Sequence, residues 1–544
     1  MTETPVTPVT PVTSTEDVLV AGAGPVGLTT ACQLARLGVQ VRVVDPLERP
    51  TTESRAVSIH ARSLEMLASL GVLDRLEARG RRIAAVEMVD GRTGRTRARM
   101  DLADAPSRHP YVLDIAQPDT EEVLAQRAAE LGVVVERGVR VSALSQDADG
   151  VTVTLVSGDG DPVERTERVG WVVGADGGHS TVRDLVDAPL HGGFHGQHFA
   201  MADVDVETSF APDAIRMFTH PDGMGMLFPL EGARARVMFF VEQPAPDAGD
   251  PTLEQMQALA DARMGGRIAL RNPRWLTYFE IHHAQVAQYR HGRVFLAGDA
   301  AHIHSPAGAQ GMNTGMQDAA NLAWKLALVV RFGADPALLD SYHDERHPVG
   351  ADVVRTTTAM TDVGTADGPE AALRDIALFV IGHVPRIGSA AATRMAELTI
   401  RYRGSALSVQ HGGHHHGAAR AGDHAPDPDG LRRPDGTPVA IEELQTRPGF
   451  LLLARSDDAG AVEELRRTLG DLGAVVRVVD AGGGPEDSVV DADGAVARDY
   501  GLGSGGIALI RPDGYLGLVA ERADAGVLRD YLARTLRITQ ASTV

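Results

Sequence analysis

The chain of 544 residues is long enough for three or four domains of about 150 residues each, and its 43% hydrophobic and 23% charged residues are typical of a globular protein. The net charge of −21, from 52 Lys and Arg against 73 Asp and Glu, would repel nucleic acid and anionic membranes, so we expect neither as a partner. The single cysteine, Cys32, excludes an internal disulfide and a thiolate zinc cluster, and neither a run of about 18 apolar residues nor a signal peptide is evident, so we expect a cytoplasmic protein.

The N-terminal part of the chain reads as a tail followed by a βαβ unit. Residues 1–16 contain PVTPVTPVT, whose prolines favour extended, solvated backbone, and we expect a disordered tail there. Strands are predicted at 18–21 and 39–44, on either side of a helix at 25–37. Later in this part the pattern predicts a helix at 119–131 and the strands VVVE, VRVSAL, VTVTLV and WVVGAD.

The character of the chain changes after residue 185. Between 186 and 284 the sequence alternates as strands do, with a helical period only at about 252–264, which predicts a mostly-β unit inserted into the first domain. The first domain is then discontinuous, with segments 17–185 and 285–403, and it turns helical after residue 317.

The C-terminal part is separated from the rest by a stretch of turn-forming residues. Residues 404–437 are rich in Gly, His and Pro and read as a linker. Residues 438–544 alternate strand and helix patterns, which predicts a small α/β sandwich as a further domain.

The first sign of chemistry is GAGPVG, which lies between the strand at 18–21 and the following helix. Its glycines, Gly22, Gly24 and Gly27, suit a tight turn, the close approach of a pyrophosphate and close helix packing, with the helix N-terminus favouring the anion. Asp45, at the end of the second strand, stands where a carboxylate would accept ribose hydroxyls. An isolated GxGxxG is often only a turn, but the strand, the helix and Asp45 in register predict a dinucleotide site.

Two more glycine-bearing strand ends follow, in WVVGADGGHSTVR and GRVFLAGDAAHIHSPAGAQGMNTG. Ser180 of the first is placed to cap a short helix. Together with GAGPVG, these segments closely resemble the three motifs of the class A flavoprotein aromatic hydroxylases, which have the p-hydroxybenzoate hydroxylase fold. More narrowly, the chain resembles bacterial phenol 2-monooxygenase-like enzymes that hydroxylate aromatic polyketides in antibiotic biosynthesis. The implied fold is α/β, with a Rossmann-type FAD-binding domain, an inserted mostly-β substrate domain at 186–284 and a C-terminal thioredoxin-like domain.

The resemblance also implies roles for individual residues toward FAD. Gly22, Gly24, Gly27 and Asp45 match positions at the ADP half, and Asp299 matches the position at the ribityl and pyrophosphate. The remaining matches are Arg55 and Gln117 on the flavin side, Asp176 in the DG motif, and Pro306, Gly308, Gly311, Met312 and Asn313 in the segment that passes the isoalloxazine ring.

Without the resemblance, Arg55 would read as a surface charge and Gln117 as a polar residue at a helix entry. The chain departs from the family pattern at two positions. Ala309 stands where the family usually has a second glycine, and Ala284 stands where an arginine is often found.

The activity implied by the resemblance is insertion of one atom of O2 into an aromatic substrate. Reduction by NADPH or NADH, which visits transiently, would precede formation of a C4a-hydroperoxyflavin that hydroxylates a polycyclic aromatic ring. A Baeyer–Villiger insertion into a ketone is the alternative on the same fold, and a non-catalytic flavin-binding regulator is a more distant one. No residue stands out as the base that would activate the substrate, so the catalytic residues stay unidentified, and a monomer or a homodimer is equally open.

Several residues have plainer interpretations that compete with functional ones. Met224, Met226, Phe228 and Pro229 alternate as a strand does and are either core or substrate-lining residues. His302 and His304 could face one side of a strand, but with only Asp299 nearby we expect no metal site, and His414–His416 read as part of a solvated linker. The last domain lacks a CxxC pair, so we expect no thiol redox activity there.

Overall fold

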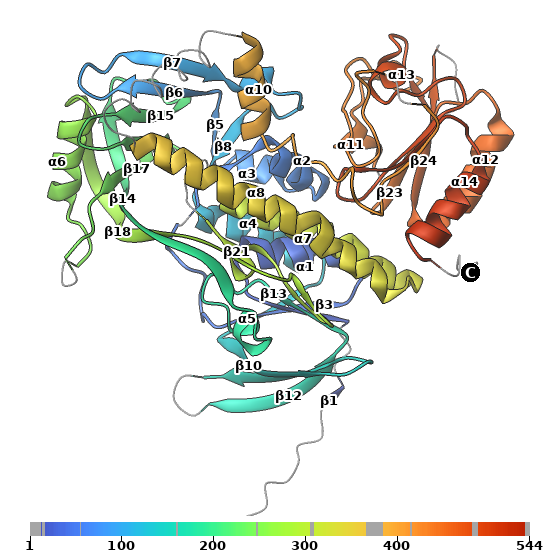
Figure 1. Cartoon of the computed structure of the whole chain (residues 1–544), viewed down its shortest axis with the longest axis horizontal. Coiled ribbons are helices and arrows are strands. Elements are labelled where there is room, and N and C mark those ends of the chain that lie inside the picture. The colour runs from blue at the N-terminus through green and yellow to red at the C-terminus, as the bar shows by residue number, and fades with distance from the viewer. Residues whose placement is uncertain are drawn as a thin grey trace, which may run out of the picture.

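The computed structural model describes residues 12–13, 17–54, 56–158, 162–245, 249–304, 309–365, 385–413, 416–445, 447–480 and 488–538. Figure 1 shows a C-terminal α/β unit, coloured orange to red, beside an N-terminal part that is built around several sheets. The long helices α7 (Gly311–Phe332) and α8 (Asp340–Thr365) run through the N-terminal part (Figure 1).

The central sheet of the N-terminal part is six-stranded and mostly parallel. Its strands, in spatial order, are β19 (Arg290–His291), β20 (Val294–Leu296), β13 (Trp171–Gly174), β2 (Val18–Ala21), β3 (Val41–Asp45) and β9 (Val134–Arg137). Strand β19 is antiparallel to β20, and the other neighbours pair in parallel. All four residues of β2 are buried, as a central parallel strand covered on both faces requires. Helix α1 (Pro25–Arg36) packs against α4 (Gln117–Glu130) and α7.

A second sheet has four strands. It orders β1 (Val12–Thr13), β12 (Val163–Val169), β11 (Val151–Ser157) and β10 (Val139–Gln146). Of the tail expected at 1–16, only Val12 and Thr13 lie within the described residues, and they pair with β12 instead of being disordered. Neither of the two is a proline, so both can take part in a ladder.

The third sheet has eight strands, and most of them lie in the segment that was expected to form the inserted unit. In spatial order they are β21 (His302–Ile303), β18 (Ile268–Val286), β14 (Leu190–Thr208), β17 (Arg234–Val241), β16 (Gly225–Pro229), β15 (Ala214–Thr219), β6 (Ala85–Asp90) and β7 (Thr96–Asp101). Strands β6 and β7 come from a segment assigned to the first domain in the sequence analysis. They join the sheet through the parallel pairing of β6 with β15, a long-range contact that leaves no periodicity in the sequence. Helix α6 (Leu253–Arg263) packs on β14 and β18.

Short elements connect these sheets. A three-stranded sheet orders β4 (Ser58–Ile59), β8 (Val112–Asp114) and β5 (Arg81–Ile83). The further helices are α2 (Ala61–Ser69), α3 (Leu73–Glu77), α5 (Thr181–Leu185) and α10 (Pro385–Met395), and single 3-10 turns occur at Leu102–Asp104, Gly298–Ala300 and Pro336–Leu339.

The C-terminal unit is built on a mixed six-stranded sheet. Its spatial order is β22 (Val409–His411), β27 (Leu516–Ala520), β26 (Ile507–Ile510), β23 (Phe450–Ala454), β24 (Gly473–Val479) and β25 (Ser488–Val490). The helices are α11 (Ile441–Leu444), α12 (Ala459–Leu469), α13 (Ala495–Asp499) and α14 (Ala525–Asp530). Strand β22 lies within the stretch expected as a linker. Trp324 and Leu328 of α7 belong to the apolar core on one face of this sheet, so the unit is packed onto α7.

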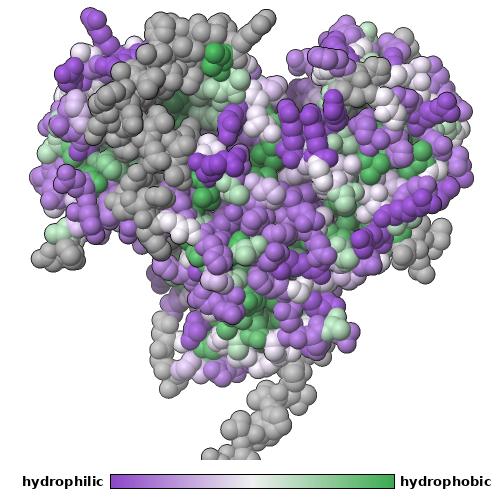
Figure 2. All heavy atoms as spheres, viewed as in Figure 1, coloured by the Kyte–Doolittle hydropathy of each residue, from purple (hydrophilic) through white to green (hydrophobic). Residues whose placement is uncertain are grey.

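On the face shown in Figure 2, hydrophilic side chains cover most of the described surface, with smaller hydrophobic groups between them. In the described residues, no helix is both long and apolar enough to span a bilayer. Cys32 is fully buried in α1, where its thiol lies 3.5 Å from the Leu124 carbonyl and burial raises its pKa to about 12. It is a residue of the main apolar core.

Candidate cofactor and substrate site

The three glycine-bearing motifs meet at one edge of the central sheet. Gly174, at the end of β13, is in register with Ala21 of β2 on one side and with Leu296 of β20 on the other. The turns that follow these strands therefore leave the sheet side by side, at the carboxyl edge where open α/β sheets bind their ligands.

In the first of these turns, two glycines are required by the protein itself. Gly22 has φ +102°, and a Cβ there would lie 2.3 Å from the Ala175 carbonyl oxygen. A Cβ on Gly27 would lie 1.9 Å from the Gly22 carbonyl oxygen. Neither position accepts a side chain, because the helix and the neighbouring strand approach too closely.

Gly24 differs from the other two, because nothing in the protein explains its missing side chain. Its φ of −78° and ψ of −176° suit any residue, and a Cβ there would meet no described atom within 4 Å. Gly24 is the N-cap of α1, whose first turn carries no acidic residue and whose cap offers no side-chain hydrogen bond. The space that a Cβ would fill thus lies before free helix amides, which fits the pyrophosphate of a dinucleotide such as FAD.

Asp45 braces this turn from the end of β3. One of its carboxylate oxygens accepts the Ala23 N–H at 2.7 Å, and the other accepts the Leu47 N–H at 2.9 Å. Arg137 forms an ion pair with it at 3.2 Å. Oδ1 accepts from both Leu47 and Arg137, whereas Oδ2 keeps a second lone pair that could still accept a ribose hydroxyl beside the turn.

Asp176 caps the start of α5. Its carboxylate accepts hydrogen bonds from the Ser180 hydroxyl and, at 3.1 Å, from the Val182 N–H, and burial raises its pKa. Ser180 in turn accepts the Arg183 N–H at 3.0 Å and is the N-cap that the sequence predicted. These contacts therefore give Asp176 a local structural role at the edge where the three turns meet.

Asp299 lies in the 3-10 turn that follows β20 and is exposed to solvent. The turn is held from α7, because Asp318 accepts the N–H of Gly298 at 3.1 Å. Asp318 is fully buried and also receives His302 Nε2 at 2.8 Å and Arg346 Nε at 2.7 Å. The sequence analysis missed Asp318 and Arg346, since both lie inside helices without any motif.

The third motif continues into α7. Pro306 and Gly308 lie outside the described residues, whereas Gly311, Met312 and Asn313 form the first turn of α7. Helix α7 begins six residues earlier than the sequence pattern indicated. Its N-cap, Gln310, gives no side-chain hydrogen bond and its first turn holds no acidic residue, so its amides form a second free positive helix end.

Asn313 ties this helix start to strand β4. Its side-chain oxygen accepts the His60 N–H at 2.9 Å, and its amide nitrogen donates to the carbonyls of Ser58 at 2.9 Å and Ala309 at 2.8 Å. Ala309 has φ +54°, the left-handed conformation that glycine adopts without strain. The departure noted at this position is therefore a strained alanine.

Gln117 links the start of α4 to the loop that precedes β4. Its side-chain oxygen accepts the Ala56 N–H at 3.1 Å, its amide nitrogen donates to Glu121 at 2.8 Å, and its backbone N–H donates to the Ser54 hydroxyl at 3.0 Å. Arg55, between Ser54 and Ala56, lies outside the described residues. Gln117 thus holds in place both neighbours of Arg55.

The inner face of the eight-stranded sheet is rich in methionine and phenylalanine. Met224, Met226 and Phe228 are buried in one apolar cluster that also contains Ala392 of α10. Leu227, between them, belongs to a different cluster on the opposite face, and Pro229 is buried at the end of β16. The further buried members of the Met226 cluster are Val57, Ile83, Leu102, Val112, Phe199, Met201, Ile215, Leu230 and Met238.

This sheet is connected to the cofactor side by Arg236, which sequence reasoning did not single out. Its guanidinium forms a two-point ion pair with Asp203 at 2.8 and 2.9 Å and donates to the Ser54 carbonyl. Both side chains are almost fully buried. The ion pair sets the Met-rich face of the sheet beside the loop that holds Arg55.

Ala284 of β18 is paired in register with Ile303 of β21. His302 in the same strand does not have a metal environment: its Nε2 is engaged by Asp318, and in the described residues no group of three or more His, Cys, Asp or Glu side chains could hold a metal ion. Of His414–His416, the first two lie outside the described residues.

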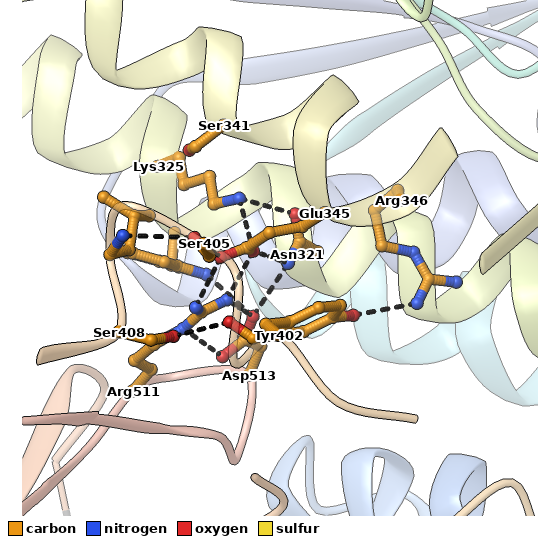
Figure 3. Close-up of polar contacts among 12 residues, drawn as sticks. Asn321, Lys325, Ser341, Glu345, Arg346, Tyr402, Ser405, Ser408, Arg511 and Asp513 are labelled. Atoms are coloured by element: carbon orange, nitrogen blue, oxygen red, sulfur yellow. Dashed lines mark hydrogen bonds and ion pairs between the residues drawn. The ribbon is translucent and has the colours of Figure 1, made fainter. Parts of the chain in front are cut away.

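A buried charge network fastens the C-terminal unit to α7 and α8 (Figure 3). Arg511 forms a two-point ion pair with Glu345 at 2.7 and 2.8 Å, and Glu345 also receives Lys325 Nζ at 2.8 Å. Asp513 accepts Asn321 at 3.1 Å. These charged groups are at most 3% exposed, and the two cations hold the pKa of Glu345 well below its usual range. Burial lowers the pKa of Lys325 to about 8, so this lysine is still mostly charged at pH 7.

The chain is similar to known proteins over most of its length. The profile of the FAD binding domain family matches residues 15–357. The 6-methylpretetramide 4-monooxygenase of Streptomyces rimosus is 37% identical over 528 residues, which are 94% of this chain and 92% of that protein. The anhydrotetracycline monooxygenase of the same organism is 34% identical over 520 residues, 92% of this chain and 94% of that protein.

Solved structures of hydroxylases have a similar fold. The OxyS anhydrotetracycline hydroxylase from Streptomyces rimosus superposes with a TM-score of 0.76 at 33% identity and covers 96% of this chain and 99% of its own. CabE, an aromatic hydroxylase from angucycline biosynthesis, has a TM-score of 0.76 at 31% identity with the same coverage.

Proposed function

The chain belongs to the FAD binding domain family and is an FAD-dependent aromatic monooxygenase, and on that premise we propose that it hydroxylates a ring of a polycyclic aromatic polyketide. Relatives that are matched over more than nine tenths of their length act, by their names, on 6-methylpretetramide and anhydrotetracycline. The observation that carries the proposal is the buried, Met-rich cluster on one face of the eight-stranded sheet, which is joined through Arg236 to the loop at Ser54 and would give a flat ligand apolar, adaptable contacts.

The residues at the sheet edge suit FAD. We assign the pyrophosphate to the amides of α1 at Gly24, the ribose to Asp45, and the ribityl side to Asp299. The flavin ring we assign to the start of α7 at Gly311 and to the neighbouring Pro306, Gly308, Met312 and Asn313, with Arg55 and Gln117 on the flavin side. Asp176, in the DG motif, we associate with both FAD and the nicotinamide donor. FAD, when bound, supplies the redox chemistry by which electrons from NADPH or NADH activate O2.

The protein's part in this chemistry is to bind FAD and the substrate and to exclude water from the site. Arg236 and Asp203 hold the substrate sheet against the loop at Ser54, and Asn313 holds the start of α7 against β4. These contacts set a rigid boundary between the two halves of the site, which is what a reaction sensitive to water needs. Met224, Met226, Phe228 and Pro229 are the proposed substrate-lining residues.

The C-terminal unit, residues 438–544, we propose to be thioredoxin-like in fold and without thiol chemistry, since Cys32 is the one cysteine of the chain. Its charge network with α7 and α8 supports a structural role in the enzyme. The single cysteine and the acidic surface are those of a cytoplasmic protein, and a monomer and a homodimer are both compatible with the proposal.

The test is a reconstitution with product analysis. The purified protein, loaded with FAD, should oxidise NADPH or NADH faster when tetracyclic or angucyclic phenols are added, and the product should gain one oxygen atom and keep an aromatic ring. A lactone of the same mass would identify Baeyer–Villiger insertion instead. Purified protein that binds FAD but shows no substrate-stimulated oxidation with any such phenol would contradict the proposed substrate class.

A further inference from the structure

Glu397 is a buried acid in an unfavourable backbone conformation. It follows α10 by two residues, is 4% exposed and has φ +61°. A residue with a side chain adopts this left-handed conformation only at a cost, and such positions concentrate at functional sites. The glutamate is therefore held in place by its surroundings and not by its own preference.

The carboxyl group of Glu397 faces a polar track on α7. Gln317 donates from Nε2 to one oxygen of Glu397, while the other oxygen, Oε1, meets no hydrogen-bond donor among the described residues. In the same part of the structure, the side-chain oxygens of Gln310, Thr314 and Gln317 are likewise buried without a donor. These three residues lie on one side of α7, at spacings of four and three residues. Buried oxygens of this kind are ordinarily satisfied by water.

The charged groups around Glu397 do not keep its carboxyl group ionised. Arg62 of α2 is engaged by Glu65 at 2.9 Å and by the Asp513 carbonyl, and Arg346 of α8 is engaged by Asp318 at 2.7 Å. Asp318 of α7 adds a like charge. Burial outweighs both guanidinium groups and raises the pKa of Glu397 to about 8, so the carboxyl carries a proton at neutral pH.

Glu397 also borders an open groove, although almost none of its own surface is exposed. It lines a cavity of about 470 Å³ between α8 and residues 394–405, whose wall includes Gln310 at the start of α7. Arg394 and Arg401, on the outer wall, are more than half exposed, so the cavity opens to water. The polar track thus runs from Glu397, on the wall of this groove, along α7 to Gln310, which borders the same groove at the N-terminal turn of the helix.

Ring hydroxylation needs such a connection. The overall reaction, ArH + O2 + NAD(P)H + H⁺ → ArOH + NAD(P)⁺ + H2O, consumes one proton, and a site that excludes water has to receive it from solvent through the protein. Gln317 is six residues from Gly311, roughly 9 Å along the helix at 1.5 Å per residue. Three or four hydrogen-bonded groups about 2.8 Å apart span that distance.

We propose that Glu397 is a proton-relay residue that takes a proton from water in the groove and passes it, through water held by Gln317 and Thr314, to the start of α7. This inference rests on the proposed function, since it supplies the proton that ring hydroxylation consumes. The proton leaves water for a carboxylate oxygen of Glu397 and leaves that oxygen for the next acceptor on α7, so no electrons move in the step. Glu397 acts through intervening groups and does not touch the substrate.

The experiment compares Glu397→Gln and Glu397→Gly with Asp344→Asn in the FAD-loaded protein. Gln keeps the size of the side chain without an ionisable proton, and Gly adopts φ +61° without strain and is expected to fold even if the Gln variant does not. Asp344 is an exposed residue on the wall of the same groove and is the matched control for loss of a carboxylate there.

Reoxidation of reduced FAD by O2 to give H2O2 also consumes one proton, so it can be followed by flavin absorbance without any substrate. We expect the wild type to reoxidise more slowly above pH 8, and we expect both Glu397 variants to reoxidise roughly tenfold more slowly and to lack that pH dependence. Acetic acid should restore the rate of the Gly variant, because a small acid can enter from the groove. Asp344→Asn should behave as the wild type.

Infrared spectroscopy gives a readout that needs no flavin. The wild type should show protonated carboxyl bands that titrate near pH 8, from Glu397 and from the buried Asp114, whose pKa burial also raises to about 8. One of these bands should be missing in Glu397→Gln. A Gln variant with wild-type bands, or one with wild-type reoxidation at every pH, would overturn the relay while leaving the monooxygenase assignment intact. A protein that binds no FAD would instead refute the proposed function.

Discussion

Replacing Gly24 by alanine tests whether this glycine is required for FAD binding or for the stability of the fold. The substitution adds one methyl group at a position with φ −78° and ψ −176°, where no described atom lies within 4 Å. An alanine at an N-cap costs about 0.5–1 kcal/mol relative to better caps, and loss of glycine's freedom in the unfolded chain returns about 0.4–1 kcal/mol. The free energy of unfolding of the FAD-free protein should therefore stay nearly unchanged.

The effect on FAD binding should be much larger. The added methyl would occupy the space before the first amides of α1 and keep a pyrophosphate oxygen from one or two of them. Charge-assisted hydrogen bonds contribute about 1.5–3 kcal/mol each, so a loss of about 2–4 kcal/mol is expected. At about 1.4 kcal/mol per factor of ten, the Kd for FAD should rise roughly 30- to 1000-fold.

The assay is titration of the FAD-free variants with FAD, followed by quenching of flavin fluorescence, with urea unfolding measured in parallel. Gly503→Ala is the matched control, because Gly503 also meets no atom within 4 Å but lies in the C-terminal unit. Gly22→Ala should fail in both assays, because its Cβ would lie 2.3 Å from the Ala175 carbonyl oxygen. If Gly24→Ala binds FAD as tightly as the wild type, the assignment of the pyrophosphate to this turn is wrong.

Three further predictions follow from strain and buried charge. Ala309→Gly relieves a left-handed alanine and should raise the free energy of unfolding by up to about 1 kcal/mol in urea titrations. Glu345→Gln removes the counter-charge of Arg511 and Lys325 and should cost about 3–5 kcal/mol by the same measurement. Glu397 has a folded pKa of about 8, above its ordinary 4.5, so the folded state holds a proton that the unfolded state releases between these values. Stability should therefore fall as pH rises from 5 to 7.5, by about 1.4 kcal/mol per pH unit more than in Glu397→Gln.

Each of these predictions has a control. Gly404→Ala, at an open position, should leave the free energy of unfolding within about 0.5 kcal/mol of the wild type, and an equal gain there would remove the case for strain at Ala309. Glu130→Gln breaks the exposed ion pair with Arg75 and should cost far less than Glu345→Gln, so equal costs at Glu345 and Glu130 would refute the importance of burial. Identical pH slopes of the wild type and Glu397→Gln would show that Glu397 is ionised in the folded protein.

The start of α7 shows where local pattern fails. The sequence pattern indicated a helical region after residue 317, and the preceding GMNTG contains two glycines and a polar pair that disfavour helix. In the structure the helix begins at Gly311, since Asn313 bonds to β4 and Met312 and Met316 are buried in the main core. Tertiary contacts outweigh a propensity deficit of this size.

The amino-acid sequence by itself determined the local parts of this protein: the strand, glycine turn and helix at 18–37, the Ser180 cap, the alternation at Met226 and the resemblance to the aromatic hydroxylases. These features depend on residues a few positions apart, whose periodicity and backbone preferences are readable in the chain.

Only the tertiary structure decided which distant parts meet. Asp318 accepts a hydrogen bond from the backbone of Gly298, and Glu397 accepts one from Gln317, which is eighty residues away in the sequence. Arg511 forms a buried ion pair with Glu345. Such contacts follow from chain topology and packing, and the acidic, basic and amide residues that make them look like ordinary polar positions in the sequence. A buried charge or a strained backbone angle is defined by what surrounds it, which the order of residues along the chain does not record.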